Sequence, residues 1–238
     1  MKKVFAFIPN LLTLCNLLSG CAAVSVLFLG ADFAAAFWLV IAAAVFDFFD
    51  GFAARMLHVS SPIGKELDSL ADMVSFGLVP AVVAFRMLAM SGLGWLAYGG
   101  FLIVAFSALR LAKFNVDERQ TEEFRGLPTP ACALFFVSLP MLDADWVAGS
   151  YLLLLGLTVA FSALLVCDMP MFSLKFKSFG WKNNRLRYVF LFLSVILIVW
   201  LRMAAPAAIV LTYIVISIGR VFCCTGTERA DTEQTADL

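Results

Sequence analysis

The sequence predicts an all-α membrane protein, a polytopic transmembrane bundle of about eight helices. Of the 238 residues, 63% are hydrophobic and only 14% are charged, and the mean hydropathy of +0.96 is far too high for a soluble globular domain. Several apolar runs reach the roughly 20 residues that a helix needs to cross a bilayer. Runs of alternating apolar and polar residues are too short for a barrel, so the backbone groups must be satisfied inside helices.

Turn formers and charges divide the apolar runs into these helices. The first follows Lys2 and Lys3, and we expect it to be retained because no small-residue cleavage site closes a short apolar core. The fifth is short and begins at Pro130, and the last two meet at Pro206, so six to eight membrane spans fit the sequence. The predicted ranges are 8 to 30, 33 to 57, 67 to 91, 94 to 115, 129 to 143, 149 to 167, 187 to 203 and 206 to 222.

Positive charge is distributed unevenly between the two ends of these helices. With eight spans, all of the 17 lysines and arginines except Arg86 and Arg202 fall on one side, which the positive-inside rule assigns to the cytoplasm. Both termini and the connections after the second, fourth and sixth helices then face the cytoplasm. The short loops and the lack of a transit-like segment favour a bacterial inner (cytoplasmic) membrane.

One membrane domain, residues 1–222, accounts for almost the whole chain. We expect the polar remainder, residues 223–238, to be a disordered cytoplasmic tail. No soluble domain is predicted, since the longest polar stretches are loops near 116 to 128 and 168 to 186. Any chemistry must therefore take place at the membrane surface, and we expect no nucleic-acid partner.

Four acidic side chains lie among apolar neighbours in the segment VFDFFDGFAARMLHVSSPIGKELDSLADMVSFG. Asp47 and Asp50 are three residues apart on the second helix, so they share one helical face. Asp68 and Asp72 are four apart on the third helix and also share a face. Serines and a proline between the helices can turn the chain back. All four carboxylates are then expected to converge on one cavity at the cytoplasmic end.

A metal site is the interpretation that we favour for these acids. Unpaired carboxylates at membrane depth are costly, and four hard oxygen ligands suit Mg²⁺ or Mn²⁺, with two ions held by shared acids. The alternative is that the acids are interfacial and satisfied by Arg55, Lys65 or water. A solvated helix end, however, does not require four acids on matched faces. Gly51 would let a ligand approach the backbone, and the nearby Arg55 is either a membrane anchor or, as we prefer, a phosphate contact.

The order of these residues resembles the signature of the CDP-alcohol phosphotransferase family. The match runs through the two acid pairs and includes Gly51, Ala54, Arg55 and, eight residues further on, Gly64. The opening IPNLLT is similar to the start of the family's first helix. The resemblance therefore covers eight residues at set spacings together with a less specific opening segment.

The resemblance implies a homodimeric helical enzyme that acts on a CDP-activated lipid. It implies that the first three acids bind metal and that Asp72 is the general base while also contributing to the metal site. It further implies that a pocket for the CDP moiety is lined by residues of the signature and, less specifically, of the opening segment: Gly51, Ala54, Arg55, Gly64, Asn10 and Thr13.

General chemistry is compatible with the same mechanism. Two divalent ions can bridge a diphosphate and neutralise the charge on a leaving CMP, while a hydroxyl nucleophile needs a base within hydrogen-bond reach. His58 is the only histidine and has no obvious nucleophile partner. Direct displacement is therefore simpler than a covalent intermediate.

Three further segments are similar to the phosphatidylserine synthase branch of that family. They are DSLADMVSFGLVPA, RLAKFN at 110 to 115 and FRGLPTPA at 124 to 131. The resemblance implies that the substrates are CDP-diacylglycerol and L-serine. Four polar residues at the cytoplasmic edge could hold the serine carboxylate or could equally be membrane anchors: Arg110, Lys113, Asn115 and Arg125. Of these we prefer Arg110 and Asn115 as serine ligands.

Other functions stay open at this point. Glycerol 3-phosphate or inositol phosphate could be the acceptor, although a phosphate would demand a denser basic pocket. An ion transporter would also place acids in membrane helices, but nearer mid-bilayer. A purely structural membrane protein would have no use for matched acids.

Overall fold

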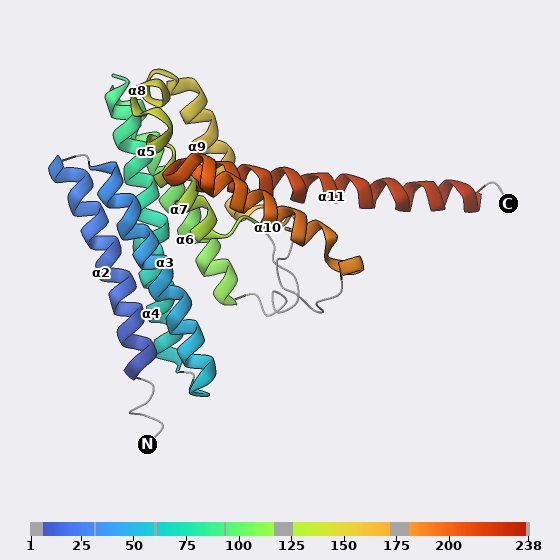
Figure 1. Ribbon diagram of the computed structural model, residues 1–238, viewed down its shortest axis with the longest axis horizontal. Coiled ribbons are helices and arrows are strands. Elements are labelled where there is room, and N and C mark those ends of the chain that lie inside the picture. Colours follow the sequence, from blue (N-terminus) through green and yellow to red (C-terminus); the bar gives the residue numbers. More distant parts are fainter. Residues whose placement is uncertain are drawn as a thin grey trace.

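The all-α fold is confirmed by a computed structural model, which describes residues 7–30, 32–59, 61–92, 94–116, 126–171 and 181–236 (Figure 1). Each of the eight predicted helical segments overlaps helical parts of the structure, although the ends of several differ. In the described part, 5 helices are long and apolar enough to cross a membrane, as in an integral membrane protein: Phe7–Gly30, Phe33–Met56, Pro62–Met90, Gly94–Val116 and Asn184–Arg220. The segments Thr129–Asp143 and Tyr151–Val166 are apolar but shorter. The number of spans and their orientation stay predictions.

The first two helices form an antiparallel pair. α2 (Phe7–Gly30) packs along α3 (Phe33–Met56), whose first turn is capped by Asp32. Buried residues recur at every third or fourth position of α2 and so form one stripe. They are polar or small toward the N-terminal end and apolar beyond it: Thr13, Asn16, Gly20, Ala23 and Leu27.

The third helical segment starts with α4 (Pro62–Asp72). Its start lies ahead of the predicted residue 67, because Ser61 caps the helix. The hydroxyl Oγ of Ser61 accepts a hydrogen bond from the Gly64 backbone nitrogen at 2.9 Å, and a proline fits the first turn since its missing N–H would have no partner there.

A π-helix follows α4 without a break. In η1 (Met73–Leu78) the turn is widened, and the backbone N–H of Val79 donates to the carbonyl of Val74, five residues earlier. α5 (Val79–Met90) then continues to the far end of the bundle. η1 packs against α2, α6 and α7, so this irregular turn lies at the centre of the bundle.

The remaining helices surround this segment. The fourth predicted helix is a 3-10 turn, η2 (Gly94–Phe101), followed by α6 (Leu102–Val116). The fifth is divided into α7 (Thr129–Ser138) and α8 (Pro140–Gly149), which is kinked at Asp143 by an extended backbone conformation. α9 (Tyr151–Val166) packs against α6 and, through Phe161, stacks on Phe135 with ring centroids 4.1 Å apart.

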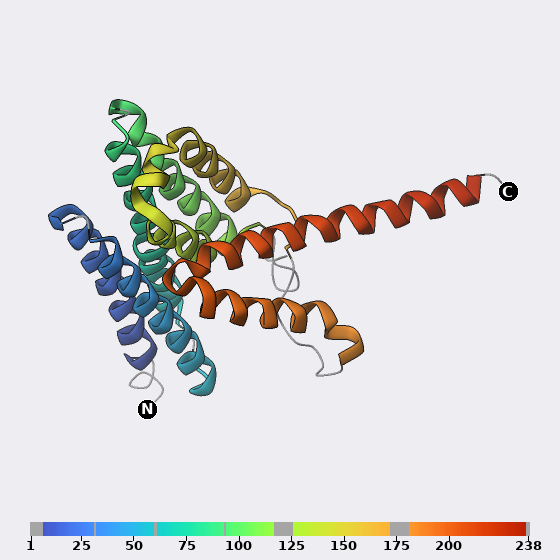
Figure 2. The same cartoon turned by 45° about the horizontal axis from the view of Figure 1, so that its top comes forward.

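The last two helices form a hairpin. α10 (Trp181–Leu201) reverses at η4 (Arg202–Ala204), where Arg202 has a φ of 50°, into α11 (Ala205–Ala236). α11 packs on α7, and both views show the hairpin set apart from α2, α3 and α4 (Figure 2). The side chains beyond residue 220 lie outside the described part of the structure, so the predicted boundary between membrane domain and tail stays a prediction.

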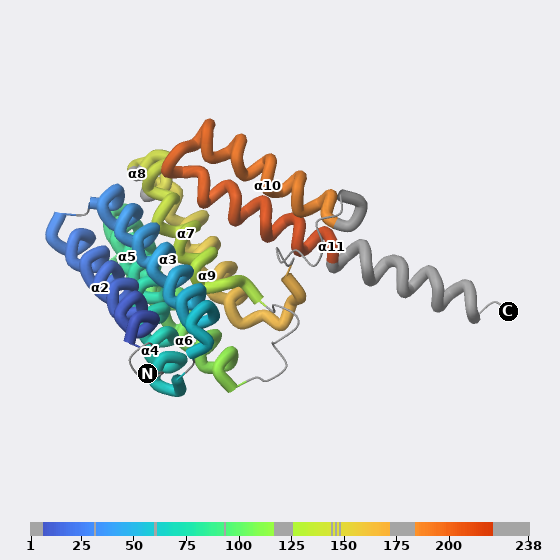
Figure 3. Tube along the Cα trace, turned by 60° about the horizontal axis from the view of Figure 1, so that its bottom comes forward, coloured from blue at the N-terminus to red at the C-terminus, as the bar shows by residue number. Residues whose placement is uncertain are grey.

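The signature acids lie at one end of this bundle. The beginning of α2, the end of α3 and the beginning of α4 lie together there, on the same side as the end of α6 (Figure 3). A hydrogen bond joins α4 to α6 at this end, from Lys65 Nζ to the Asn115 carbonyl oxygen at 3.2 Å. His58, as predicted, lies in the turn between α3 and α4 and is exposed.

Candidate active site

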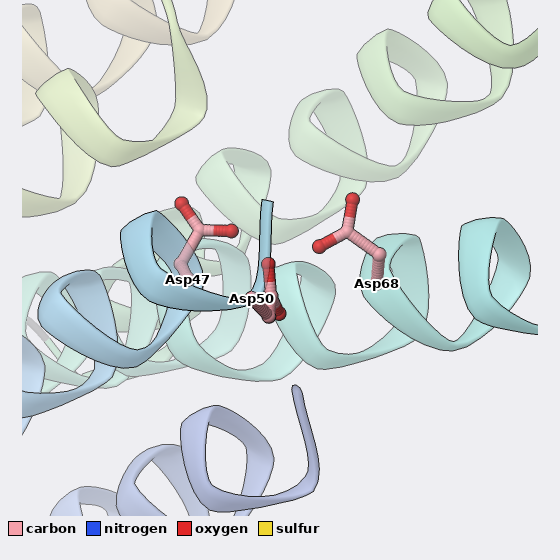
Figure 4. Close-up of side chains that lie close together, drawn as sticks. All are labelled: Asp47, Asp50 and Asp68. Atoms are coloured by element: carbon pink, nitrogen blue, oxygen red, sulfur yellow. The ribbon is translucent and has the colours of Figure 1, made fainter. Parts of the chain in front are cut away.

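Three carboxylates of the signature converge between α3 and α4. One ligand oxygen from each of Asp47, Asp50 and Asp68 lies within 4.8 Å of the others. Figure 4 shows the three side chains pointing toward one another across the gap between the two helices. Asp50 is buried and the other two are half-buried. The predicted meeting of the two acidic helix faces is thus confirmed for these three residues.

Asp72 lies close to this group without being part of it. Its charge interacts with the charges of Asp47, Asp68 and Asp50, and it is half-buried one turn beyond Asp68. Its role as a further metal ligand, which we predicted, stays a prediction. Four like charges in so small a space repel one another, and this makes a bound cation favourable.

The chemistry of these donors fits a divalent metal ion. In the described part of the chain, none of the four carboxylates forms an ion pair with a lysine or arginine. Their negative charge is therefore not compensated by a contacting side chain, and carboxylate oxygens are the ligands that Mg²⁺ and Mn²⁺ prefer. The group Asp47, Asp50 and Asp68 could hold a metal ion.

Two polar side chains of α2 hold the acids from the opposite side. Thr13 Oγ1 lies 2.6 Å from Asp50 Oδ2 and 3.0 Å from the Pro9 carbonyl oxygen, and its single proton can be donated to either. Asn16 donates from Nδ2 to Asp72 Oδ1 at 3.2 Å. Thr13 was expected to contact the nucleotide, and the sequence pattern did not predict a role for Asn16. A polar residue in the stripe that α2 buries is the signal that could have found it.

A cavity of about 270 Å³ opens beside the acids. Five of the predicted nucleotide-binding residues line it, together with both Asp50 and Asp68. The predicted lining residues are Asn10, Thr13, Gly51, Ala54 and Gly64, and those not predicted for it are Pro9, Val59, Ser61 and Lys65.

The two glycines of the signature have different reasons for being glycine. A Cβ at Gly64 would lie 3.0 Å from both Asn10 Oδ1 and Ser61 Oγ, so a side chain there would require these two polar groups to shift. A Cβ at Gly51 would contact only Arg55 Nη2, at 3.9 Å, and would take up space in the cavity. Gly51 thus keeps the cavity open where a ligand would approach α3.

Arg55 lies next to this cavity but does not line it. Its Nε donates to the Gly51 carbonyl oxygen at 2.9 Å, and the side chain is exposed. This bond fixes the stem of the arginine along the last turn of α3. The guanidinium is thereby held beside the mouth of the site, and its role as a phosphate contact stays a prediction.

On the side of α6, one arginine approaches Asp72. Arg110 attracts Asp72 electrostatically and donates from Nη1 to Thr129 Oγ1 at 2.8 Å. Its buried Nε has no hydrogen-bond partner within the described residues. This arginine therefore keeps an unused donor close to the acids.

The other predicted serine ligands lie further out or are already engaged. Asn115 donates from Nδ2 to Ser69 Oγ at 2.9 Å, which joins α6 to α4. Lys113 is exposed and forms an ion pair with Asp168 at 2.6 Å. Arg125 lies outside the described residues. Of the three that the structure describes, Arg110 has the geometry closest to the prediction.

The position of Arg110 depends on a tight turn before α7. Gly126 has a φ of 75°, and a Cβ there would lie 2.8 Å from the Cys167 carbonyl oxygen. The backbone nitrogens of Gly126 and Leu127 donate to carbonyls of Met169 and Leu164. This segment is thereby attached to the end of α9, which places the buried Thr129 where it can receive Arg110.

Comparison with known proteins defines the class to which this fold and site belong. Residues 6–167 match the sequence profile of the CDP-alcohol phosphatidyltransferases, and the chain belongs to this family. The family that the signature predicted is thus confirmed.

Individual relatives share one printed name, CDP-diacylglycerol–serine O-phosphatidyltransferase. The one from Helicobacter pylori is 32% identical over 197 residues, which cover 80% of this chain and 81% of that protein. The one from Bacillus subtilis is 35% identical over 157 residues, 62% of this chain and 86% of its own. A relative from Mycobacterium leprae is 40% identical over 149 residues, 58% of this chain and 49% of that protein.

Proposed function

We propose that this chain transfers the phosphatidyl group of CDP-diacylglycerol to the hydroxyl of L-serine, giving phosphatidylserine and CMP. The observation that carries the proposal is the convergence of Asp47, Asp50 and Asp68 beside a cavity lined by the other signature residues. The names of relatives that are 32 to 40% identical support serine as the acceptor.

The CDP moiety occupies the cavity between α2, α3 and α4. Asn10, Gly51 and Gly64 present amide and backbone atoms to it, and Lys65 adds a positive charge that suits a diphosphate. Arg55, held by its bond to Gly51, reaches a phosphate from the rim. The acyl chains then extend along the apolar helix surfaces into the bilayer.

The acids that line this cavity hold the metal. Asp50 and Asp68 face the cavity, and Asp47 completes the group. We propose that this group of acids binds two ions, Mg²⁺ or Mn²⁺, with Asp72 as an additional ligand. When bound, such ions neutralise charge on the diphosphate and on the leaving phosphate.

The transfer is a direct displacement at the phosphorus that carries diacylglycerol. The serine hydroxyl oxygen forms a new bond to this phosphorus while the bond to the CMP oxygen breaks, and CMP leaves with the electron pair. The hydroxyl proton passes to the carboxylate of Asp72, which is close to the other acids but does not line the nucleotide cavity.

The serine approaches from the side of α6. Arg110 lies next to Asp72 with one unused N–H, so it can bind the serine carboxylate while the hydroxyl faces Asp72. Asn115, Lys113 and Arg125 are weaker candidates for the same task. Arg110→Ala should therefore raise the KM for serine by about 10-fold or more, whereas Lys113→Ala, which removes an exposed side chain paired with Asp168, should change it much less.

We further propose that the enzyme is a homodimer in a bacterial inner membrane, with the acids facing the cytoplasm. The positive-inside bias supports this orientation. The family match ends at residue 167, whereas the predicted membrane domain extends to residue 222. We therefore propose that α10 and α11 are an addition to the family core.

The test is CMP release by the purified protein with CDP-diacylglycerol and Mn²⁺ or Mg²⁺, with serine, glycerol 3-phosphate and inositol phosphate supplied separately. We expect release with serine, its loss with a chelator and its return on adding either metal. Release with one of the other acceptors would keep the chemistry and replace serine. Failure with every acceptor, from folded protein that still binds CDP, would contradict the proposal and leave ion transport as the alternative.

A further inference from the structure

Asn16 occupies a position that packing alone does not explain. It lies in the middle of α2, an apolar helix, and its exposure is 0%. Its Nδ2 donates to Asp72 Oδ1 at 3.2 Å, but its Oδ1 is buried and has no hydrogen-bond partner among the described residues. A buried amide with an unsatisfied acceptor costs stability, which an apolar residue of similar size would avoid.

The direction of this amide is determined by its neighbour. An ionised carboxylate only accepts hydrogen bonds, so Nδ2 has to face Asp72 and Oδ1 has to face away. Neither Asn16 nor Asp72 lines the nucleotide cavity. Asn16 therefore has no direct route to the CDP moiety, and its effect on the site passes through Asp72.

A second hydrogen bond fixes the backbone of Asn16 against the helix that carries Asp72. Ser75, three residues after Asp72 and fully buried in η1, donates from Oγ to the Asn16 carbonyl oxygen at 2.9 Å. Gly20, one turn further along α2, allows the two backbones to approach closely, since a Cβ there would lie 2.9 Å from Ser75 Cα. The two hydrogen bonds run in opposite directions between α2 and the third helical segment, so together they define both the spacing and the register.

We propose that Asn16 is a positioning residue for the transfer reaction: held by Ser75, it fixes the direction of the Asp72 carboxylate toward the acceptor hydroxyl. This inference rests on the proposed function in one respect, because it takes Asp72 to be the group that receives the proton. With Oδ1 of Asp72 engaged by Asn16, the carboxylate is held in one orientation, from which it receives the proton of the hydroxyl. Without Asn16 the carboxylate can rotate about its own side-chain bonds and lose that alignment.

The test compares Asn16→Ala with the matched control Asn184→Ala. Asn184 is also a buried asparagine, 1% exposed, but it lies on α10 in the hairpin set apart from the acids (Figure 1). Each variant is purified in full length, and the measurements are kcat and KM for serine-dependent CMP release together with Mn²⁺ and CDP affinity by calorimetry. For Asn16→Ala we expect kcat to fall about 10- to 100-fold, as for loss of other residues that orient a site ligand, with KM for CDP-diacylglycerol and CDP affinity unchanged, and any change in Mn²⁺ affinity smaller than that in Asp47→Asn.

Two results would overturn this inference. One is a kcat for Asn16→Ala equal to that of the control. The other is a parallel loss of kcat and of CDP affinity, which would mean that the substitution disturbs the whole site. If the alanine variant does not fold, Asn16→Ser serves instead, because a serine on α2 can donate to the carbonyl four residues earlier, as Ser19 and Ser25 do. Failure of the wild-type protein to use serine would count against the proposed acceptor alone, since the same comparison can then be made with the acceptor that it does use.

Discussion

Replacing Gly20 by alanine would test how closely the first helix has to pack against η1. A Cβ at this position would lie 2.4 Å from Ser75 Oγ, 2.9 Å from Ser75 Cα and 3.1 Å from its nitrogen. The hydroxyl could rotate away, but the backbone atoms cannot. The two helices would have to separate by about 0.5 Å to restore an ordinary carbon–carbon contact. Overpacking of this kind costs about 1–3 kcal/mol, against a gain of about 1 kcal/mol from replacing a helical glycine by alanine.

Gly156→Ala is the matched control for that substitution. Gly156 lies within α9 and a Cβ there would meet nothing within 4 Å. This variant therefore measures only the stability gained when alanine replaces a glycine within a helix. The assay is unfolding of both purified variants in mixed micelles by titration with a denaturing detergent, together with kcat for CMP release. We expect Gly20→Ala to be less stable than the control by about 1–3 kcal/mol and to lose activity as Asn16 moves away from Asp72. Equal stability and equal kcat in the two variants would refute the close-packing argument.

Three further outcomes are expected at the site and around it. Asp72→Asn should lower kcat about 100-fold or more while sparing much of the CDP affinity. Asp47→Asn should also weaken Mn²⁺ binding in calorimetry. Equal metal affinity in the two variants would contradict this division of roles. Arg55→Lys should raise the KM for CDP-diacylglycerol, because a point charge cannot replace a planar fork, and unchanged kinetics would make Arg55 a membrane anchor. Gly126→Ala should lower the free energy of unfolding by at least about 1–2 kcal/mol. The residue has a φ of 75°, and a Cβ there would lie 2.8 and 2.9 Å from two carbonyl oxygens. A variant as stable as wild type would show that the turn can rearrange.

The acid cluster could be predicted from sequence because helical periodicity and the cost of burying charge act on it together. Spacings of three and four residues place each pair of aspartates on one face, and the turn before Pro62 is short enough to bring the two faces together. The pocket residues Gly51 and Gly64 followed from the family signature. All of these patterns lie on two consecutive helices, so their arrangement depends little on how the rest of the bundle packs.

The contacts from α2 could not be predicted in the same way. Thr13 and Asn16 are separated from the acids that they contact by 37 and 56 residues, and the rotation of α2 about its axis decides which of its side chains reach them. Asn115 illustrates the same difficulty: its position near the site was expected, but its amide is occupied by Ser69. The start of α4 was misplaced although the capping serine and the proline after it are visible in the sequence.

The π-helix lets the third helical segment hold one residue more than an unbroken α-helix would. Each residue of an α-helix turns the chain by about 100°, and η1 accommodates the extra residue in its widened turn between Asp72 and α5. Removing one residue from η1 would let the turn close to an ordinary helix with little rotation of the face that carries Asp68 and Asp72. Removing one residue from the regular helix of α5 instead would rotate that face by about 100° relative to the rest of the segment. The two parts of this segment therefore tolerate insertions and deletions differently, even where every individual side chain of the acid group is kept.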